Sequence, residues 1–176
     1  MSFLKAAKAQ TGHPSDSTPL LEQIFLVNTI NALMKLEEWK DMAILVTYDD
    51  SDGWYDHVMP PIVNQSSDPA NDLLLGPGLC GTAKSGAYLD RCGYGPRLPF
   101  LVISPFARRN YVSHALIDQT SILRFIEDTW DLGRIGDQSF DALAGSILDN
   151  FDFKSEPREG TLQLDPTTGQ ITKHDD

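Results

Sequence analysis

A short segment of the chain, TYDDSDGWYDHVMPP, concentrates side chains that can bind a metal ion. It contains Asp49, Asp50, Asp52, Asp56 and His57. Neighbouring carboxylates repel one another, and a divalent cation relieves that repulsion because such ions prefer oxygen ligands with an occasional imidazole. A plain acidic turn is the other interpretation, since DSDG is itself a favourable turn sequence. The Gly and the final Glu of an EF-hand loop are missing, so a calcium site of that type is excluded.

Two cysteines lie in a glycine-rich stretch, Cys80 in GLCGT and Cys92 in DRCGYG. A disulfide and two reduced thiols are both compatible with this pair, because two cysteines alone do not identify the redox compartment. We expect the disulfide, since an exposed loop would leave unpaired thiols open to oxidation. The chain holds no CxxC motif and its histidines are scattered, which argues against a zinc site.

A few helices must position these side chains. Apolar residues at three- and four-residue steps predict a long amphipathic helix over residues 18–39. The same spacing predicts a helix over residues 118–130, which Asp118 or Thr120 can cap. A further short helix is expected over residues 139–148.

Two short apolar runs, MAILVTY at 42–48 and LPFLVIS at 98–104, are typical of buried strands. With the helices they predict an α/β fold, a mostly parallel sheet flanked by helices. Functional groups gather beyond the carboxyl ends of strands in such folds, and the acidic segment follows the first strand directly. Residues 59–96 are rich in Pro and Gly and predict an irregular functional loop. Residues 154–176 predict a polar, loosely attached tail.

Charge and hydropathy exclude several functions. The formal net charge of −11 repels a phosphate backbone, so we expect no nucleic-acid partner. No apolar run approaches the roughly 18 residues of a membrane span, so we expect a chain that is not transmembrane. The first residues, MSFLKAAKAQ, lack the apolar core and cleavage site of a signal peptide.

Three segments in order carry a resemblance to a known family: AILVTYDDSDGWYDHVMPP, GYGPRLPFLVISPFARRNYVSH and DQTSILRFIEDTWDLGRIGDQSFDALAGSI. From about Phe3 to Phe153 the chain resembles the C-terminal half of the bacterial phosphoesterase family, which includes phospholipases C and acid phosphatases. The resemblance implies an alkaline-phosphatase-like fold, of which residues 1–153 would be the C-terminal portion and residues 154–176 a tail. It also implies a hydrolase that acts on a phosphate ester or a phospholipid.

The resemblance also implies roles for individual residues. The acids that bind the catalytic metal in the family match Asp49 and Asp50, and the histidine that faces the substrate phosphate matches His13 in QTGHPSDSTP. Asp52 is a candidate for the surroundings of the metal, a divalent ion whose identity the sequence leaves open. His57 is either a further candidate for these surroundings or a residue that bonds the local backbone, and the sequence favours neither. We expect Arg97 to form a structural ion pair. Because the family is commonly exported, the resemblance favours a secreted or cell-envelope location and the Cys80–Cys92 disulfide.

The chain departs from the family in its length. The Glu-Asn pair and the nucleophile expected in the preceding half have no counterpart here, so we expect a truncated part of the full domain that hydrolyses little by itself. Such a part is expected to self-associate or to bind a complementing N-terminal half. The alternative function is a non-catalytic acidic α/β domain that binds a divalent cation or a partner chain.

Overall fold

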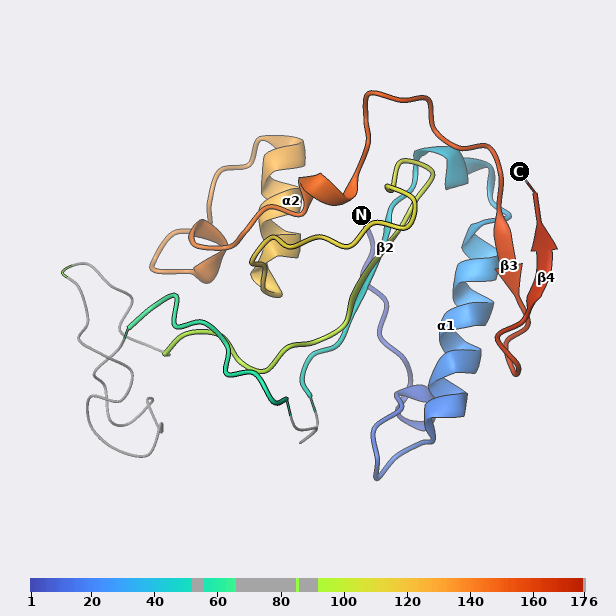
Figure 1. Cartoon of the computed structure of the whole chain (residues 1–176), viewed down its shortest axis with the longest axis horizontal. Coiled ribbons are helices and arrows are strands. Elements are labelled where there is room, and N and C mark those ends of the chain that lie inside the picture. Colours follow the sequence, from blue (N-terminus) through green and yellow to red (C-terminus); the bar gives the residue numbers. More distant parts are fainter. Residues whose placement is uncertain (52–55, 66–84, 86–91, 176) are drawn as a thin grey trace. The chain divides into compact units, whose positions relative to one another are not determined.

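The computed structural model describes residues 1–51, 56–65, 85 and 92–175 (Figure 1). Within this part the chain is a small α/β structure with two α-helices and two small two-stranded antiparallel sheets. It divides into two compact units. The first unit comprises Met1–Val46, Phe100–Ser113 and Asn150–Asp176, and the second comprises Thr47–Pro99 and His114–Asp149.

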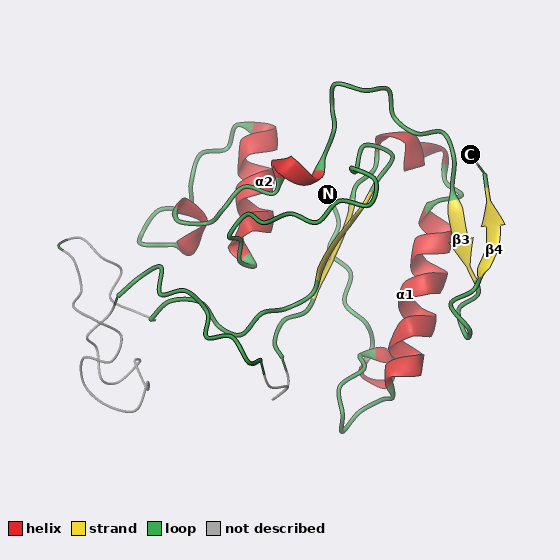
Figure 2. Ribbon diagram, viewed as in Figure 1, coloured by secondary structure: helices red, strands yellow, loops and turns green. Residues whose placement is uncertain are grey.

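Both predicted strands form and lie next to each other (Figure 2). β1 (Ile44–Thr47) pairs with β2 (Phe100–Ile103) in a two-stranded sheet. In Figure 1 the chain runs along β1 in one direction and along β2 in the opposite direction. The two strands are therefore antiparallel, and the described sheet is not the mostly parallel sheet that we expected. A parallel pair needs a crossover that is usually helical, and the described residues of the connection between these strands contain no helix.

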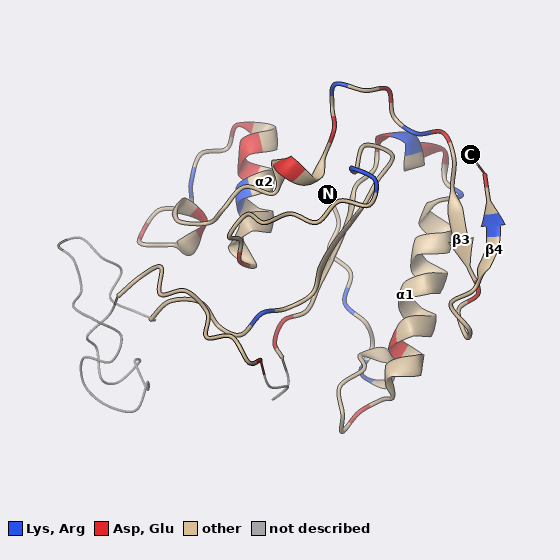
Figure 3. Cartoon of the chain, in the orientation of Figure 1, with Lys and Arg blue, Asp and Glu red and all other residues tan. Residues whose placement is uncertain are grey.

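The first predicted helix is shorter and less amphipathic than expected. α1 covers Pro19–Leu33, with Thr18 as its N-cap, and the chain then enters a 3₁₀ turn, η2 (Glu37–Asp41), where Trp39 is buried. Apolar residues occupy every side of α1, no residue of α1 is buried, and Glu22 is its one charged residue (Figure 3). A helix that is apolar all round usually lies inside a larger core.

The polar tail is not loosely attached. It forms a hairpin of β3 (Leu162–Leu164) and β4 (Ile171–His174), paired antiparallel and placed beside α1 (Figure 1). The Asn31 amide donates to the Leu164 carbonyl at 2.7 Å and accepts from the Leu164 N–H at 3.3 Å. Gln23 donates to the carbonyls of Pro166 and Thr167 at 3.0 and 3.1 Å. Side-chain amides on α1 therefore hold the tail through its main chain.

The second unit is built around α2 (Thr120–Trp130), close to the predicted helix. The expected helix over 139–148 is wrong: two short 3₁₀ turns, η3 (Phe140–Ala142) and η4 (Leu148–Asn150), stand at the ends of an irregular stretch. A side chain at Gly145 would collide with the Leu116 carbonyl, so the backbone approaches another segment there. Ala144 and Ile147 are buried in this stretch, so its apolar residues fill the core without helical spacing.

Asn31→Ala is expected to destabilise the chain by about 1–3 kcal/mol, because it removes one donor and one acceptor from the main chain of β3. Urea unfolding measures the loss, and amide hydrogen exchange should rise over residues 162–174. Asn28→Ala is the matched control, since Asn28 is an exposed asparagine on the same helix. Equal effects of the two substitutions would contradict the docking role of Asn31.

Candidate metal and phosphate site

The acidic segment begins where β1 ends. Asp49 and Asp50 follow Thr47 after a single tyrosine, and both are exposed. The run of β-branched residues stops here, so the strand ends and the two aspartates lie beyond its carboxyl end, as the sequence predicted. Asp52 lies outside the described residues, so its proposed place beside the metal stays a prediction.

Gln119, at the N-cap of α2, holds the start of this segment. Its amide nitrogen donates to the carbonyl oxygen of Tyr48 at 2.7 Å and to that of Asp49 at 2.8 Å. Both distances are short for N–H···O hydrogen bonds. The main chain that carries Asp49 is therefore fixed to the first turn of a helix. Sequence reasoning missed this residue, because a glutamine next to a helix cap has no distinctive spacing.

Asp118 caps α2, as one of the two predicted candidates. Its Oδ1 accepts from the Thr120 hydroxyl at 2.6 Å and from the Ser121 N–H at 3.2 Å, and its own N–H donates to the Ser121 hydroxyl at 3.1 Å. Ser121 is buried. Burial raises the pKa of Tyr94, and the hydrogen bond and charge of Asp118 raise it further. The start of α2 is thus fixed to the segment that precedes β2.

Asp56 is paired within the second unit. Arg97 approaches it with two nitrogens, Nε to Oδ2 at 3.3 Å and Nη2 to Oδ1 at 3.3 Å, and this pair is the structural ion pair that we expected of Arg97. The Val58 N–H also donates to Oδ1 at 3.0 Å. The Val58 hydrogen bond is the main reason that the pKa of Asp56 is lowered, with the Arg97 charge next among the favourable causes. His57 is exposed beside Asp56.

His13 lies in a tight loop before α1. The Ser15 N–H donates to its Nδ1 at 3.3 Å, and the Ser15 hydroxyl lies 3.0 Å from the same nitrogen. A backbone N–H can only donate, so Nδ1 is the acceptor and the proton of the neutral ring is on Nε2. Gly12 precedes it with φ +75°, and the Ser17 hydroxyl accepts from the Gly12 N–H at 2.7 Å. The loop presents His13 as an exposed side chain.

The donor atoms of Asp49 and Asp50 suit a divalent cation, because adjacent exposed carboxylates supply hard oxygen ligands. Two carboxylates fill only part of a coordination shell, and the described residues bring no third His, Cys, Asp or Glu into a common group with them. His13 belongs to the first unit and the aspartates to the second, so their opposition across a cleft stays a prediction. Cys92 carries no free thiol, but Cys80 lies outside the described residues, and their pairing also stays a prediction.

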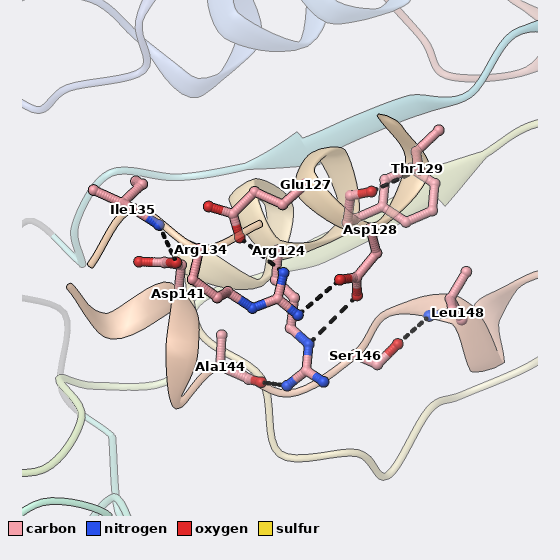
Figure 4. Close-up of polar contacts among 11 residues, drawn as sticks. Arg124, Glu127, Asp128, Thr129, Arg134, Ile135, Asp141, Ala144, Ser146 and Leu148 are labelled. Atoms are coloured by element: carbon pink, nitrogen blue, oxygen red, sulfur yellow. Dashed lines mark hydrogen bonds and ion pairs between the residues drawn. The ribbon is translucent and has the colours of Figure 1, made fainter. Parts of the chain in front are cut away.

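Sequence reasoning also missed a charged cluster at the end of α2 (Figure 4). Arg134 Nη1 lies 3.1 Å from Glu127 Oε2, and its Nη2 lies 2.7 Å from Asp128 Oδ1. Glu127 and Asp141 are buried, and Arg124 forms an i,i+4 pair with Asp128. Burial by itself would raise the pKa of Asp141, but hydrogen bonds to its carboxylate outweigh that effect and lower it. Only the i,i+4 spacing was visible in the sequence.

Comparison with known proteins identifies relatives of this chain. Residues 1–133 match the family described as the phosphoesterase family. A non-hemolytic phospholipase C of Burkholderia pseudomallei is 33% identical over 138 residues, which are 72% of this chain and 18% of the relative. A non-hemolytic phospholipase C of Pseudomonas aeruginosa is 28% identical over 184 residues, 97% of this chain and 25% of the relative. Phospholipase C B of Mycobacterium tuberculosis is 30% identical, and the matched residues make up 24% of that relative. The chain thus spans a quarter or less of the length of these relatives.

Arg97→Gln is expected to raise the pKa of Asp56 without restoring its ordinary value, because the Val58 N–H still donates. A carboxyl whose folded pKa is lowered stabilises the fold above its ordinary pKa, and that contribution disappears as the pH falls through the folded pKa. The variant should therefore lose less stability on acidification over that range. Carbon NMR of the carboxyl signal measures the pKa, with Arg109→Gln as the control. An unchanged Asp56 pKa would contradict the pairing.

Gly12→Ala is expected to destabilise the His13 loop more than Gly169→Ala destabilises its own turn. Both glycines have a positive φ, +75° and +70°, so both variants carry a backbone cost of about 1–2 kcal/mol. A Cβ at Gly12 would also collide with the Glu22 side chain, whereas at Gly169 it would meet open space. Urea unfolding compares the two, and adding Glu22→Ala should recover much of the difference. Equal costs would show that the Glu22 contact is unimportant.

Proposed function

The chain belongs to the phosphoesterase family, and from this premise we propose that it is the metal-binding C-terminal portion of a phosphoric-ester hydrolase of the phospholipase C or acid phosphatase type. The observation that carries the proposal is the pair Asp49 and Asp50, exposed at the end of β1 within the matched residues. The names of the curated relatives support a phosphate ester or a phospholipid as the substrate. Family resemblance also supports a secreted or cell-envelope location.

In this proposal Asp49 and Asp50 hold a divalent cation. A bound cation would supply positive charge that stabilises the phosphoryl oxygens of the substrate. The two carboxylates of this chain bind and orient the cation, and other ligands complete its shell. His57 and Asp52 are proposed to lie around it. The nucleophile is assigned to the portion of the relatives that this chain does not match, because no serine or threonine of the described residues lies in a strand-to-helix turn of the required type.

His13 is proposed to act on the substrate phosphate. With Nδ1 accepting from the Ser15 N–H, the proton on Nε2 is available to a phosphoryl oxygen or to the leaving alkoxide. The hydrogen bond from the Gly12 N–H to the Ser17 hydroxyl holds the main chain that carries His13. His13 therefore combines electrostatic stabilisation with proton donation, and it does not bind the metal.

The remaining portion of the domain is proposed as the partner of α1. Leu20 and Leu21 are 46% and 41% exposed, and Leu101 on β2 is 55% exposed. Such a surface favours packing against a complementing N-terminal half, or self-association when that half is absent. No helix in the described part of the chain has the length and apolar character needed to cross a membrane.

Asp50→Asn is expected to weaken divalent-metal binding by at least about tenfold, because it replaces a charged ligand with a neutral one. His13→Ala should leave metal binding unchanged. Isothermal titration with Mn²⁺ on the purified chain measures both, and Asp41→Asn is the control, since Asp41 is an exposed aspartate shortly before β1. The chain itself should bind Mn²⁺ weakly, since part of the shell is missing. Equal Mn²⁺ binding by the wild type and Asp50→Asn would contradict the role of Asp50 as a metal ligand.

Activity is tested on the chain alone and on the chain combined with the proposed complementing N-terminal half. The substrates are a chromogenic phosphate ester and phosphatidylcholine, which separate phosphatase from phospholipase activity. In the combined protein His13→Ala should lower turnover by about 10²–10⁴-fold, the usual contribution of a general acid. Strong turnover by this chain alone would contradict the assignment of the nucleophile to the missing portion.

A further inference from the structure

Gln119 makes an unusual pair of contacts with the acidic segment. One amide nitrogen donates to two successive main-chain carbonyls, at 2.7 Å to Tyr48 and at 2.8 Å to Asp49. A side-chain amide carries two N–H groups, so each proton has its own acceptor. A carboxylate of the same shape has no proton to give at neutral pH. The contact therefore requires a side chain with N–H donors, which the glutamine amide supplies and a glutamate does not.

The two carbonyls lie in the two peptide planes that flank Asp49. The Tyr48 carbonyl belongs to the peptide bond before the Asp49 Cα, and the Asp49 carbonyl belongs to the peptide bond after it. Each peptide bond is planar, so fixing both planes fixes the φ and ψ angles of Asp49. The second plane also carries the main-chain nitrogen of Asp50. Gln119 thus sets the direction in which the Asp49 side chain leaves the main chain and the position of the Asp50 main-chain nitrogen.

The start of α2, which carries Gln119, is also held in place by hydrogen bonds. Gln119 is the N-cap of α2, and its neighbour Asp118 bonds the hydroxyl of Thr120 and both polar groups of buried Ser121. A helix end capped in this way has little freedom to shift. The amide of Gln119 therefore transmits the position of a rigid helix to an exposed strand end.

We propose that Gln119 is a positioning residue for the metal: it holds Asp49 and Asp50 in the arrangement that binds a divalent cation before the cation arrives. The inference rests on the metal site under the proposed function. Adjacent carboxylates repel each other and spread apart on a freely moving chain, which weakens their joint affinity. Residues that orient metal ligands without touching the metal typically contribute 10–100-fold in affinity. Gln119 is expected to contribute about tenfold.

The test is a Mn²⁺ titration of the ¹⁵N-labelled chain, followed by NMR. Mn²⁺ is paramagnetic and broadens the amide signals of residues next to it, so weak binding is located residue by residue. In the wild type, the Asp49 and Asp50 signals should broaden first. Gln119→Met has a similar size with no donor and no charge, and it should require about tenfold more Mn²⁺ for the same broadening. Gln119→Glu should behave in the same way or worse, because its charge repels both carbonyls.

Two controls separate positioning from folding. Gln138→Glu adds the same charge at an exposed glutamine of the same unit and should leave the titration unchanged. Thermal unfolding of each variant shows whether the fold has survived, and amide signals along α2 should keep their positions in Gln119→Met. A variant that unfolds at a lower temperature but binds Mn²⁺ like the wild type would show that Gln119 is only a structural link, and the inference would be wrong.

The outcomes also distinguish the inference from the function on which it rests. If the wild type shows no broadening at Asp49 and Asp50, the metal site of the proposed function fails, and the inference fails with it. If the wild type broadens there and Gln119→Met broadens at the same Mn²⁺ concentration, the inference alone fails. If only Gln119→Glu is weakened, its charge is responsible, and the positioning role of the amide is overturned.

Discussion

The candidate site depends on the hydrogen bonds that Asp118 and Gln119 make at the start of α2. Asp118 accepts from the Ser121 N–H at the helix start, while Gln119 bonds the main chain after β1. A helix start leaves several N–H groups without intrahelical partners, so a cap is needed there in any case. Here the same turn supplies the cap and the attachment of the acidic segment.

The carboxylates of the acidic segment differ in their exposure. Asp56 is held by two nitrogens of Arg97 and by the Val58 N–H, which commits it to structure. Asp49 and Asp50 are exposed at the strand end, where a cation can reach them. Repulsion among several acids in one short segment is costly, and the ion pair of Asp56 with Arg97 reduces it.

The first unit shows how a chain with little buried apolar surface keeps its elements together. Two side-chain amides of α1 bind the main chain of the C-terminal hairpin, and the apolar side chains of α1 remain partly exposed. Hydrogen bonds from side chain to main chain therefore join α1 to the hairpin. The chain spans a quarter or less of the length of its matched relatives.

The sequence by itself determined β1, β2, the existence of both helices and the family, because each depends on local spacing or on residues close in the chain. It predicted an ion pair for Arg97 but not its partner Asp56, which is 41 residues away, and it left Asp118 and Thr120 open as the cap of α2. Tertiary structure decided the antiparallel pairing of β1 with β2, the docking of the C-terminal hairpin on α1 and the irregular stretch at Gly145. It also decided that Gln119 holds Asp49. These features join residues distant in the chain, and a side-chain amide that bonds a remote carbonyl leaves no periodic pattern in the sequence.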